Sequence, residues 1–279
     1  MSGANVRSAG AWTAILLAGQ RPGEDAFAQA YGVSAKALIP VGGEPMLGRV
    51  ARTLLECPSV GRILILAQEP EALMEGELAW LAAEPRVSTA RAAPGISTSI
   101  AAVAGGPRAP YPVLIATADH PLLRPEMVEH FIAASEGLDI GFALVERQVV
   151  ERVHVTRRTW IKFQDGHFTG ANLFALVTPA SAKGVGFWAR VERDRKKVLR
   201  LLLFFGPTIF LRAFTRTISH HAAVAKAGRN IGLRLRAVLL PFAEAAIDVD
   251  KPADLELAER ILAARVESGE SDPPGPPRA

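Results

Sequence analysis

Apolar and polar segments alternate through the first half of the chain, a pattern typical of a parallel sheet with crossover helices. Short apolar runs predict strands over residues 12–18, 62–67, 87–91, 112–118 and 139–145. The stretches between them predict helices over residues 46–56, 70–81, 97–103 and 125–134. Ser97 or Thr98 is expected near the N-cap of the third of these helices. The pattern therefore predicts an α/β fold with a mostly parallel central sheet flanked by helices.

The second half of the chain is less regular. Strands are expected over residues 149–155, 160–163, 172–177 and 235–240, with Asp165-Gly166 as a hairpin turn. Helix is expected through residues 181–229, then a short extended piece over 246–249 and a final helix over 252–265. We expect a single domain over residues 1–266, with a basic and apolar helical elaboration at about 181–230. Residues 267–279 are rich in Ser, Gly and Pro and predict a disordered tail.

The composition is that of a globular protein large enough to bury a substantial core in one domain. Of its 279 residues, 49% are apolar and 22% charged, and the net charge is +4. That charge suits phosphate-bearing ligands but gives no argument for nucleic acid. The single cysteine, Cys57, excludes an intrachain disulfide framework and a cysteine-based zinc site. Because neither a signal peptide nor a membrane-spanning segment is indicated, we expect a cytoplasmic protein.

The first predicted strand ends at a glycine and leads into a loop with cations. The apolar residues 14–18 are followed by Gly19 and Arg21, and Lys36 precedes the next apolar run. Glycine lets the backbone approach a ligand, its N–H groups can point at anions, and Arg21 and Lys36 can balance their charge. The stretch favours phosphate binding, although a strand with a basic surface loop would give the same pattern. Residues 24–31 predict a short helical insert within the loop.

Residues 14–41 resemble the N-terminal signature of the MobA-like nucleotidyltransferases, enzymes of GT-A-type, Rossmann-like fold. In that family a Leu-x-Ala-Gly strand end and its loop wrap a nucleoside triphosphate, and a later lysine neutralises the phosphates. The resemblance implies catalytic roles for Lys36 and Arg21. It also implies nucleotide contacts from the end of the strand, namely Leu17, Ala18 and Gly19. The loop is longer here than in the family, and Gln20 replaces the usual second small residue.

A carboxylate follows the strand predicted over residues 112–118. In open α/β sheets, ligands bind at the carboxyl ends of the strands. A carboxylate at that edge can hold Mg²⁺, because Mg²⁺ prefers oxygen ligands. The segment from Asp119 to Leu123 resembles the family's metal-aspartate motif, which implies that Asp119 binds the metal. The alternative is that Asp119 caps the helix that follows. We assign no role to His120.

A second acidic cluster, Asp248-Val249-Asp250, precedes the last predicted helix. It is similar to the family's closing motif, which implies that Asp250 provides the second Mg²⁺ contact. Asp254 lies in the first turn of the helix, where it suits the dipole and can cap N–H groups. Asp248 is ambiguous, since the triplet could present both carboxylates to a metal. The triplet also matches the Asp-x-Asp motif of GT-A glycosyltransferases.

Two further segments are candidates for ligand contact. The loop with Gly95, Ser97 and Ser99 looks like the family loop that reads base and ribose, although an ordinary helix cap needs only one of these hydroxyls. Asn172 lies in a segment similar to the start of a strand that, in related enzymes, lies over the acceptor substrate. This similarity implies that Asn172 hydrogen-bonds the acceptor; the alternative is an asparagine that only forms a turn. His220 and His221 are adjacent and are expected to be surface residues.

Residues 190–216 interleave eight basic residues with bulky apolar ones and only two acidic residues. Three interpretations remain open: helices packed on the sheet, a homodimer contact, or contact with a membrane surface or lipid-linked acceptor. The resemblance implies an Mg²⁺-dependent transfer of a nucleoside monophosphate from CTP or GTP to a phosphorylated small-molecule or lipid-linked acceptor, with release of pyrophosphate. The alternatives are a glycosyltransferase that uses a nucleotide sugar, and a non-catalytic nucleotide-binding protein or a protein peripheral to the inner membrane.

Overall fold

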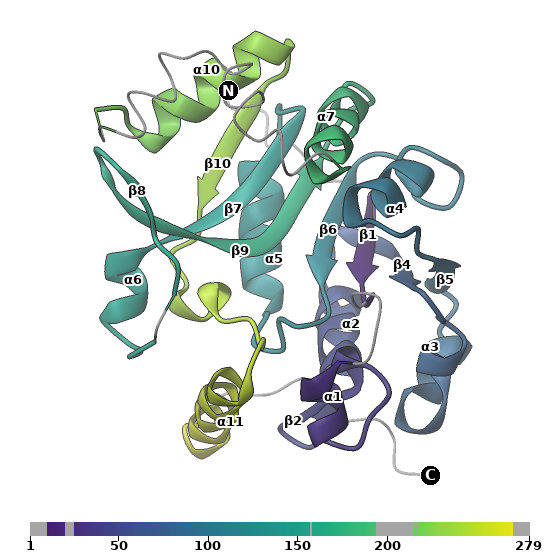
Figure 1. Ribbon diagram of the computed structural model, residues 1–279. Helices are drawn as coiled ribbons and strands as arrows, with labels where there is room; N and C mark the ends of the chain where they lie inside the picture. Colours follow the sequence, from purple (N-terminus) through teal and green to yellow (C-terminus); the bar gives the residue numbers. More distant parts are fainter. Residues whose placement is uncertain (1–9, 20–24, 157, 194–214, 216, 270–279) are drawn as a thin grey trace, which may run out of the picture.

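The computed structural model describes residues 10–19, 25–156, 158–193, 215 and 217–269. Within this part of the chain, the strands of the central sheet are β1 (Trp12–Leu17), β4 (Val60–Ala67), β5 (Val87–Arg91), β6 (Val113–Thr117), β7 (Ile140–Glu146), β8 (Ile161–Phe163), β9 (Gly166–Leu176) and β10 (Leu235–Leu239). Their order is β10-β7-β9-β6-β1-β4-β5, with β8 paired to β9 (Figure 1). A separate small hairpin joins β2 (Pro40–Val41) to β3 (Glu44–Pro45).

The sheet is mostly parallel, as the sequence predicts. Strand β1 runs parallel to β4 and β6, β4 runs parallel to β5, and β7 runs parallel to β10. Strand β9 pairs antiparallel with β6, β7 and β8. The strands beside β9 therefore all point the same way, and their carboxyl ends lie at one edge of the sheet.

Helices cover both faces of this sheet (Figure 1). The α-helices are α1 (Ala26–Ala30), α2 (Met46–Glu56), α3 (Ala79–Ala83), α4 (Ile96–Val103), α5 (Pro125–Ala134), α6 (Arg147–Glu151), α7 (Ser181–Arg193), α10 (His220–Ile231) and α11 (Pro252–Glu267) in the described residues. Short 3₁₀ turns are η1 (Lys36–Leu38), η2 (Ala72–Met74), η3 (Gly76–Leu78) and η5 (Ala243–Ala246). The α/β fold class predicted from the sequence is confirmed.

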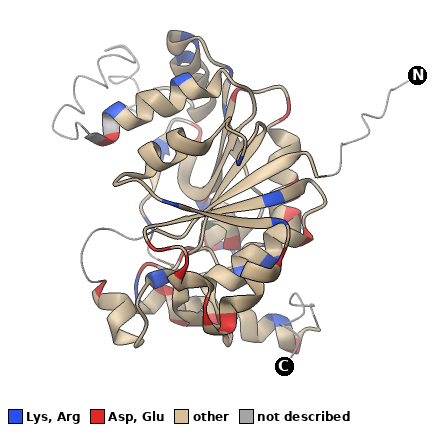
Figure 2. Cartoon of the chain, turned by 90° about the vertical axis from the view of Figure 1, so that its right-hand side faces the viewer, with Lys and Arg blue, Asp and Glu red and all other residues tan. Residues whose placement is uncertain are grey.

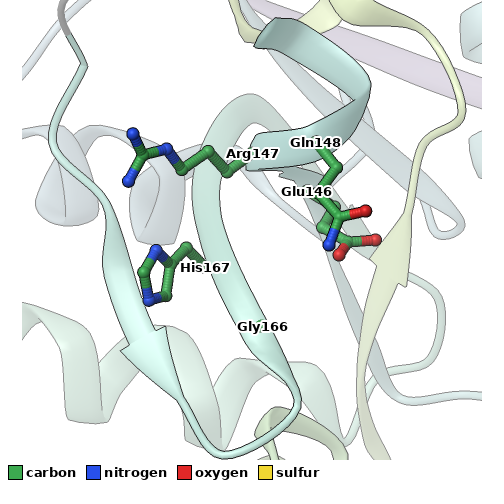
Figure 3. Close-up of a pocket in the computed structure, with 5 residues that line it drawn as sticks. All are labelled: Glu146, Arg147, Gln148, Gly166 and His167. Carbon is green, nitrogen blue, oxygen red and sulfur yellow. The ribbon is translucent and has the colours of Figure 1, made fainter. Parts of the chain in front are cut away.

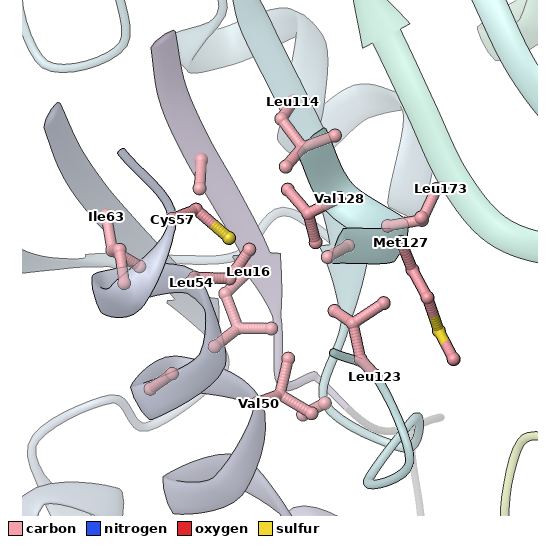
Figure 4. Close-up of a cluster of buried hydrophobic side chains, with 14 of the residues drawn as sticks. Leu16, Val50, Leu54, Cys57, Ile63, Leu114, Leu123, Met127, Val128 and Leu173 are labelled. Atoms are coloured by element: carbon pink, nitrogen blue, oxygen red, sulfur yellow. The ribbon is translucent and has the colours of Figure 1, made fainter. Parts of the chain in front are cut away.

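Neighbouring residues of each strand pack on opposite faces, because side chains alternate across a sheet. Leu16 of β1 belongs to a buried cluster with Leu54 of α2 and Met127 of α5 (Figure 4). Ile15, one residue earlier, is buried on the other face in a cluster with Ile100 of α4. The apolar run of β1 is thus explained by burial on both sides, which is typical of a central parallel strand.

Some predicted elements differ from the structure. Residues 149–155 do not form a strand, because β7 ends at Glu146 and the chain turns at once into α6, where Arg147 Nε donates to Glu151 Oε1 at 2.6 Å. The helix predicted over 70–81 is divided into η2, η3 and α3, since Gly76 has φ +57°, a left-handed conformation. Helix α4 begins at Ile96 with Gly95 as its N-cap, and Thr98 Oγ1 accepts from Gly95 N at 3.1 Å, so Ser97 and Thr98 lie near the cap as predicted.

The second half contains the hairpin expected near residue 165. Phe163 pairs with Gly166, so the turn residues are Gln164 and Asp165, one position earlier than predicted. Helices α7 and α10 lie in the segment expected to be helical, but residues 194–214 lie outside the described residues, as does the tail from 270 onward. In the part of the chain that is described, no helix is long and apolar enough to cross a membrane.

Candidate active site

The candidate site lies at the carboxyl ends of β1 and β6. These strands are neighbours, with Leu17 paired to Thr117, and Ala118 N donates to Leu17 O at 2.9 Å. Gly19 and Asp119, which follow these two strands, therefore lie at the same edge of the sheet. In open α/β sheets this edge forms the ligand-binding crevice. In Figure 1 the arrows of β1 and β6 point toward the end of the molecule where α1 and α11 lie.

The side chain of Lys36 joins two of the predicted carboxylates. Its Nζ donates to Asp119 Oδ2 at 2.7 Å and also to Asp250 Oδ1. The backbone links the same segments, because Val249 N donates to Asp119 O at 2.8 Å. Three residues that the sequence places in separate motifs thus converge on one ammonium group.

The three segments that carry Lys36, Asp119 and Asp250 pack together through one buried apolar cluster. It contains Val41 after Lys36, Leu122 after Asp119, and Val249 beside Asp250, all buried. Helix α11 contributes to the same cluster and is fixed to the β2–β3 hairpin, where its Glu259 accepts a hydrogen bond from the Gly42 backbone at 2.9 Å. Burial of apolar neighbours thereby holds the charged side chains in register.

The charge of the site keeps Lys36 protonated. Burial by itself would lower the pKa of Lys36, but the charge of Asp119 and hydrogen bonds to Asp119 and Asp250 outweigh burial and raise that pKa. Asp119 is also held on its other oxygen, where Thr117 Oγ1 donates to Oδ1 at 2.6 Å. Asp119 does not cap the next helix, because α5 has Arg124 at its N-cap.

His120, next to Asp119, is a structural residue. It is 1% exposed, and its Nε2 lies 3.3 Å from Glu244 O. Burial lowers the pKa of His120 to about 4, so the ring is neutral at physiological pH. His220 corrects an expectation, since its Nδ1 lies 2.7 Å from Asp165 Oδ2 and its ring packs on Phe168. Partial burial and this hydrogen bond make His220 part of the α10–hairpin contact, whereas His221 is exposed as expected.

Asp248 and Asp250 have different partners although only one residue separates them. Asp248 Oδ1 accepts from Arg158 Nη1, and Asp248 Oδ2 accepts from Asn172 Nδ2 at 3.1 Å. Arg158 Nη2 also donates to Asp248 O at 3.1 Å. Asp254 is buried, and its Oδ2 accepts from Asp250 N at 3.2 Å, which ties the triplet to the start of α11.

The comparison with known families agrees with this geometry. The family model described as the MobA-like NTP transferase domain matches residues 14–172, more than half of the chain. The chain belongs to the MobA-like NTP transferase family. Its enzyme class is that of the nucleotidyltransferases. The match includes Lys36, Asp119 and Asn172, whereas Asp250 and α7 lie beyond it.

Solved structures show the same fold. A hypothetical transferase from Thermus thermophilus is 28% identical, with a TM-score of 0.71, and the match covers 87% of this chain and 98% of that one. 4-Diphosphocytidyl-2C-methyl-D-erythritol synthase from Anaerococcus prevotii is 10% identical, with a TM-score of 0.53 and coverage of 91% and 99%. CMP:2-keto-3-deoxy-manno-octonic acid synthetase, complexed with CTP, is 16% identical, with a TM-score of 0.55 and the same coverage. No curated protein matches the sequence.

The residues present in this MobA-like site fit a magnesium ion. Asp119 and Asp250 contact a single ammonium, so one small cation could reach oxygens of both. Mg²⁺ is commonly held by one or two carboxylates together with substrate phosphates and water. The described residues contain no cluster of three or more His, Cys, Asp or Glu ligands, so any such ion would depend on the substrate for further ligands.

The net charge of the site also suits a divalent cation. Four carboxylates (Asp119, Asp248, Asp250 and Asp254) face two cationic side chains (Lys36 and Arg158) among the described contacts. Four negative charges against two positive ones leave two negative charges. In Figure 2 most of the ribbon coloured for Asp and Glu lies in the lower half of the view, the end toward which β1 and β6 run.

The loop expected to read the base contacts the protein itself. Ile96 N and Ser97 N donate to the carboxylate of Glu192 in α7 at 3.0 and 2.9 Å, and Ser97 Oγ also binds it. Ser99 Oγ donates back to Gly95 O at 2.7 Å. The hydroxyls of Ser97 and Ser99 therefore both have protein partners, and Glu192 occupies the first N–H groups of α4.

Some expected residues are not brought into this arrangement. Arg21 lies outside the described residues, as does most of the basic segment 190–216. A separate pocket between α6 and β9 is lined by Glu146, Arg147, Gln148, Gly166 and His167 (Figure 3). None of the site residues predicted from the sequence lines that pocket.

Sequence reasoning missed Arg158 and Glu192. Arg158 lies in an irregular segment 90 positions before Asp248, and Glu192 lies 95 positions after Ser97. The only local signal was charge: Arg158 is one of two adjacent arginines before β8, and Glu192 is one of two acidic residues in a basic segment. Charge of this kind marks most exposed surfaces equally well, so it did not identify either contact.

Proposed function

We propose that this MobA-like protein transfers a nucleoside monophosphate from CTP or GTP to a phosphorylated acceptor and releases pyrophosphate, with Mg²⁺ as cofactor. The observation that carries the proposal is the convergence of Lys36, Asp119 and Asp250 at the carboxyl edge of β1 and β6. In a nucleotidyltransferase, a cation beside paired carboxylates at that edge is suited to a triphosphate and its metal ion.

The proposed chemistry is a single displacement. A phosphate oxygen of the acceptor attacks the α-phosphorus of the nucleoside triphosphate and forms a new P–O bond. The bond from the α-phosphorus to the oxygen that bridges to the β-phosphorus breaks, and its electrons leave with pyrophosphate. No covalent enzyme intermediate is needed, so catalysis rests on alignment and on stabilisation of negative charge.

Each residue at the edge has a role in this scheme. The Lys36 ammonium would bind phosphate oxygens, and Arg21 would add positive charge from the loop. Asp119 and Asp250 would hold Mg²⁺, which when bound supplies positive charge to the triphosphate. The strand end would contact the nucleotide through Leu17, Ala18 and Gly19. The start of α4 would contact base and ribose through Gly95, Ser97 and Ser99, and for Ser97 this requires the Glu192 carboxylate to leave the first turn of α4.

The solved structures support a pyrimidine nucleotide as one candidate donor. One of them is a CMP-sugar-acid synthetase complexed with CTP, and another is a diphosphocytidyl synthase. Both share only the fold with this chain at 10–16% identity, so CTP and GTP are tested together. The acceptor would be a phosphorylated small molecule or a lipid-linked phosphate.

The glycosyltransferase alternative receives less support from the acidic triplet. Asp248 binds Arg158 and Asn172 while Asp250 binds Lys36, so the two carboxylates of the triplet have separate partners. A shared site would need Asp248 to leave two partners.

Pyrophosphate release tests the proposal. The protein is incubated with Mg²⁺, each of the four nucleoside triphosphates and a panel of phosphorylated metabolites, and release is measured for each pair. We expect release with CTP or GTP, and a loss of about 10²-fold or more in kcat/KM for Asp119→Asn, because the carboxylate stabilises charge through the metal. Glu136→Gln, an exposed change in the turn after the C-terminus of α5, is the matched control.

Two results would contradict the proposal. One is absence of pyrophosphate with every pair, together with sugar transfer from a nucleotide sugar. The other is an Asp119→Asn variant that folds and turns over like the wild type, which would remove the metal assignment.

A further inference from the structure

Asp248 is held from three directions although it does not contact Lys36. Its two carboxylate oxygens accept from Arg158 and Asn172, and its backbone carbonyl accepts from Arg158 Nη2. The Arg158 side chain is only 11% exposed and that of Asp248 is 23% exposed. A charged pair this well covered keeps its geometry, because either partner left alone would be a poorly solvated charge.

The position of Asn172 in β9 explains how it reaches Asp248. The pairing of β7 with β9 shifts between Phe142 and Leu144, whose partners are Phe174 and Gly170, so β9 has extra residues there. Asn172 lies in this bulge with φ +52°, a left-handed conformation that asparagine tolerates better than most residues. Bulges redirect a side chain out of the normal alternation, and here the amide points to Asp248.

Asp248 and Asp250 are separated by one residue, so the contacts that fix Asp248 also restrict the position of Asp250. The residue between them, Val249, is buried and donates its N–H to Asp119 O at 2.8 Å. On the other side, Asp254 accepts from Asp250 N, and Arg158 Nη2 lies 4.0 Å from Asp254 Oδ1. Arg158 therefore contacts Asp248 and lies close to Asp254, the residues that flank Asp250 on both sides.

We infer that Arg158 and Asn172 are positioning residues that act through Asp248 to hold the Asp250 carboxylate beside Asp119. Asp248 then positions the metal ligand Asp250 and does not itself bind the metal. Asn172 hydrogen-bonds Asp248 and does not contact the acceptor. The inference rests on the proposed function, because it assumes that Asp250 contacts the metal. Partners of metal ligands typically change metal affinity by roughly 10–100-fold when they are removed.

Binding of Mn²⁺ without turnover tests this inference. Free Mn²⁺ is followed by electron paramagnetic resonance, in the presence of the α,β-methylene analogue of CTP and, separately, of GTP. We expect Arg158→Met and Asp248→Asn each to weaken Mn²⁺ binding by about tenfold or more. Asn172→Gly, which retains access to the left-handed backbone, removes only the amide and should weaken binding by a smaller factor.

A double variant shows whether Arg158 acts through Asp248. We expect the double variant, which combines Arg158→Met and Asp248→Asn, to have the same Mn²⁺ affinity as the single variant with the lower affinity, or a higher one. The reason is that both changes break the same contact. The double variant also removes both charges of the pair, so it keeps the test usable if Arg158→Met alone does not fold. Arg236→Met, an exposed change in β10, is the matched control and should bind as the wild type does.

Two results would overturn the inference. One is wild-type Mn²⁺ affinity in folded Arg158→Met or Asp248→Asn while Asp250→Asn loses affinity; the proposed function would then stand. The other is a double variant whose loss equals the product of the two single losses. If Asp250→Asn itself binds Mn²⁺ like the wild type, the metal assignment in the proposed function falls as well.

Discussion

At the scale of single residues, the ammonium group of Lys36 lies where two carboxylates face each other. Without it, Asp119 and Asp250 would repel across a short gap. A lysine here stabilises the two carboxylates and, in the proposed reaction, binds the phosphates of the nucleotide with its ammonium group. The same contact implies that Lys36 and a metal ion compete for these oxygens until a nucleotide is bound.

The substitution Lys36→Met tests this competition. We expect the variant to bind Mn²⁺ more tightly than the wild type when no nucleotide is present, because a competing cation has been removed. In the same variant pyrophosphate release should fall by about 10²-fold or more, since charge stabilisation is lost. Lys183→Met, an exposed change on α7, is the control for both measurements. Weaker Mn²⁺ binding in Lys36→Met would contradict competition.

At the scale of elements, Asp139 joins the beginnings of β7 and β10 to the end of β9. Its carboxylate accepts from Thr178 Oγ1 at 2.7 Å, from Arg234 N at 2.8 Å and from Arg234 Nη2 at 3.0 Å. Hydrogen bonds from Arg234 hold the pKa of Asp139 well below its ordinary value, against the effect of burial. These contacts tie the start of β7 to both of its neighbours in the sheet, β9 and β10.

We expect Asp139→Asn to lower the free energy of unfolding by about 2 kcal/mol at pH 7, the typical range for hydrogen bonds to a buried charge. Because the folded pKa is depressed, this stability is fully present above the unfolded pKa near 3.8 and is lost as pH falls toward the folded pKa. Urea unfolding should therefore show a smaller difference between variant and wild type at about pH 3 than at pH 7. A difference that stays constant with pH, or one matched by Glu136→Gln, would refute the assignment.

At the scale of the whole molecule, one core joins the sheet to α2 and α5. Cys57, which follows α2, is 1% exposed and lies within that core (Figure 4). Burial, with a smaller contribution from the charge of Glu129, raises the pKa of the Cys57 thiol far above its ordinary value. The only thiol of the chain is thus both covered and protonated at neutral pH.

Cys57 should therefore report unfolding of the molecule. We expect a thiol reagent at pH 8 to label the native protein at least about 10³-fold more slowly than the urea-unfolded chain, since labelling requires opening of the core. Asp139→Asn should accelerate labelling of the native state, because it raises the population of open molecules. Equal labelling rates for native and unfolded protein would show that the core does not protect this position.

The sequence by itself determined the elements whose signals are local. The apolar run of β1, the amphipathic helix α2 and the proline that starts α5 are each encoded within a few residues, and they were predicted within one or two positions. The ordered motifs around Lys36, Asp119 and Asp250 are likewise short, so the family and the edge of the sheet could be named from them.

Only the tertiary structure decided which side chains meet. Arg158 and Asp248 are 90 positions apart, Lys36 and Asp250 are 214 apart, and Ser97 and Glu192 are 95 apart. Periodicity and turn chemistry describe the nearest neighbours along the chain, and they carry no information about contacts that arise when distant segments pack. Residues 149–155 show the same limit, since their β-branched composition favoured a strand while the turn after β7 imposed α6. The local pattern therefore specified the parts, and packing of distant segments around a shared core assembled the site.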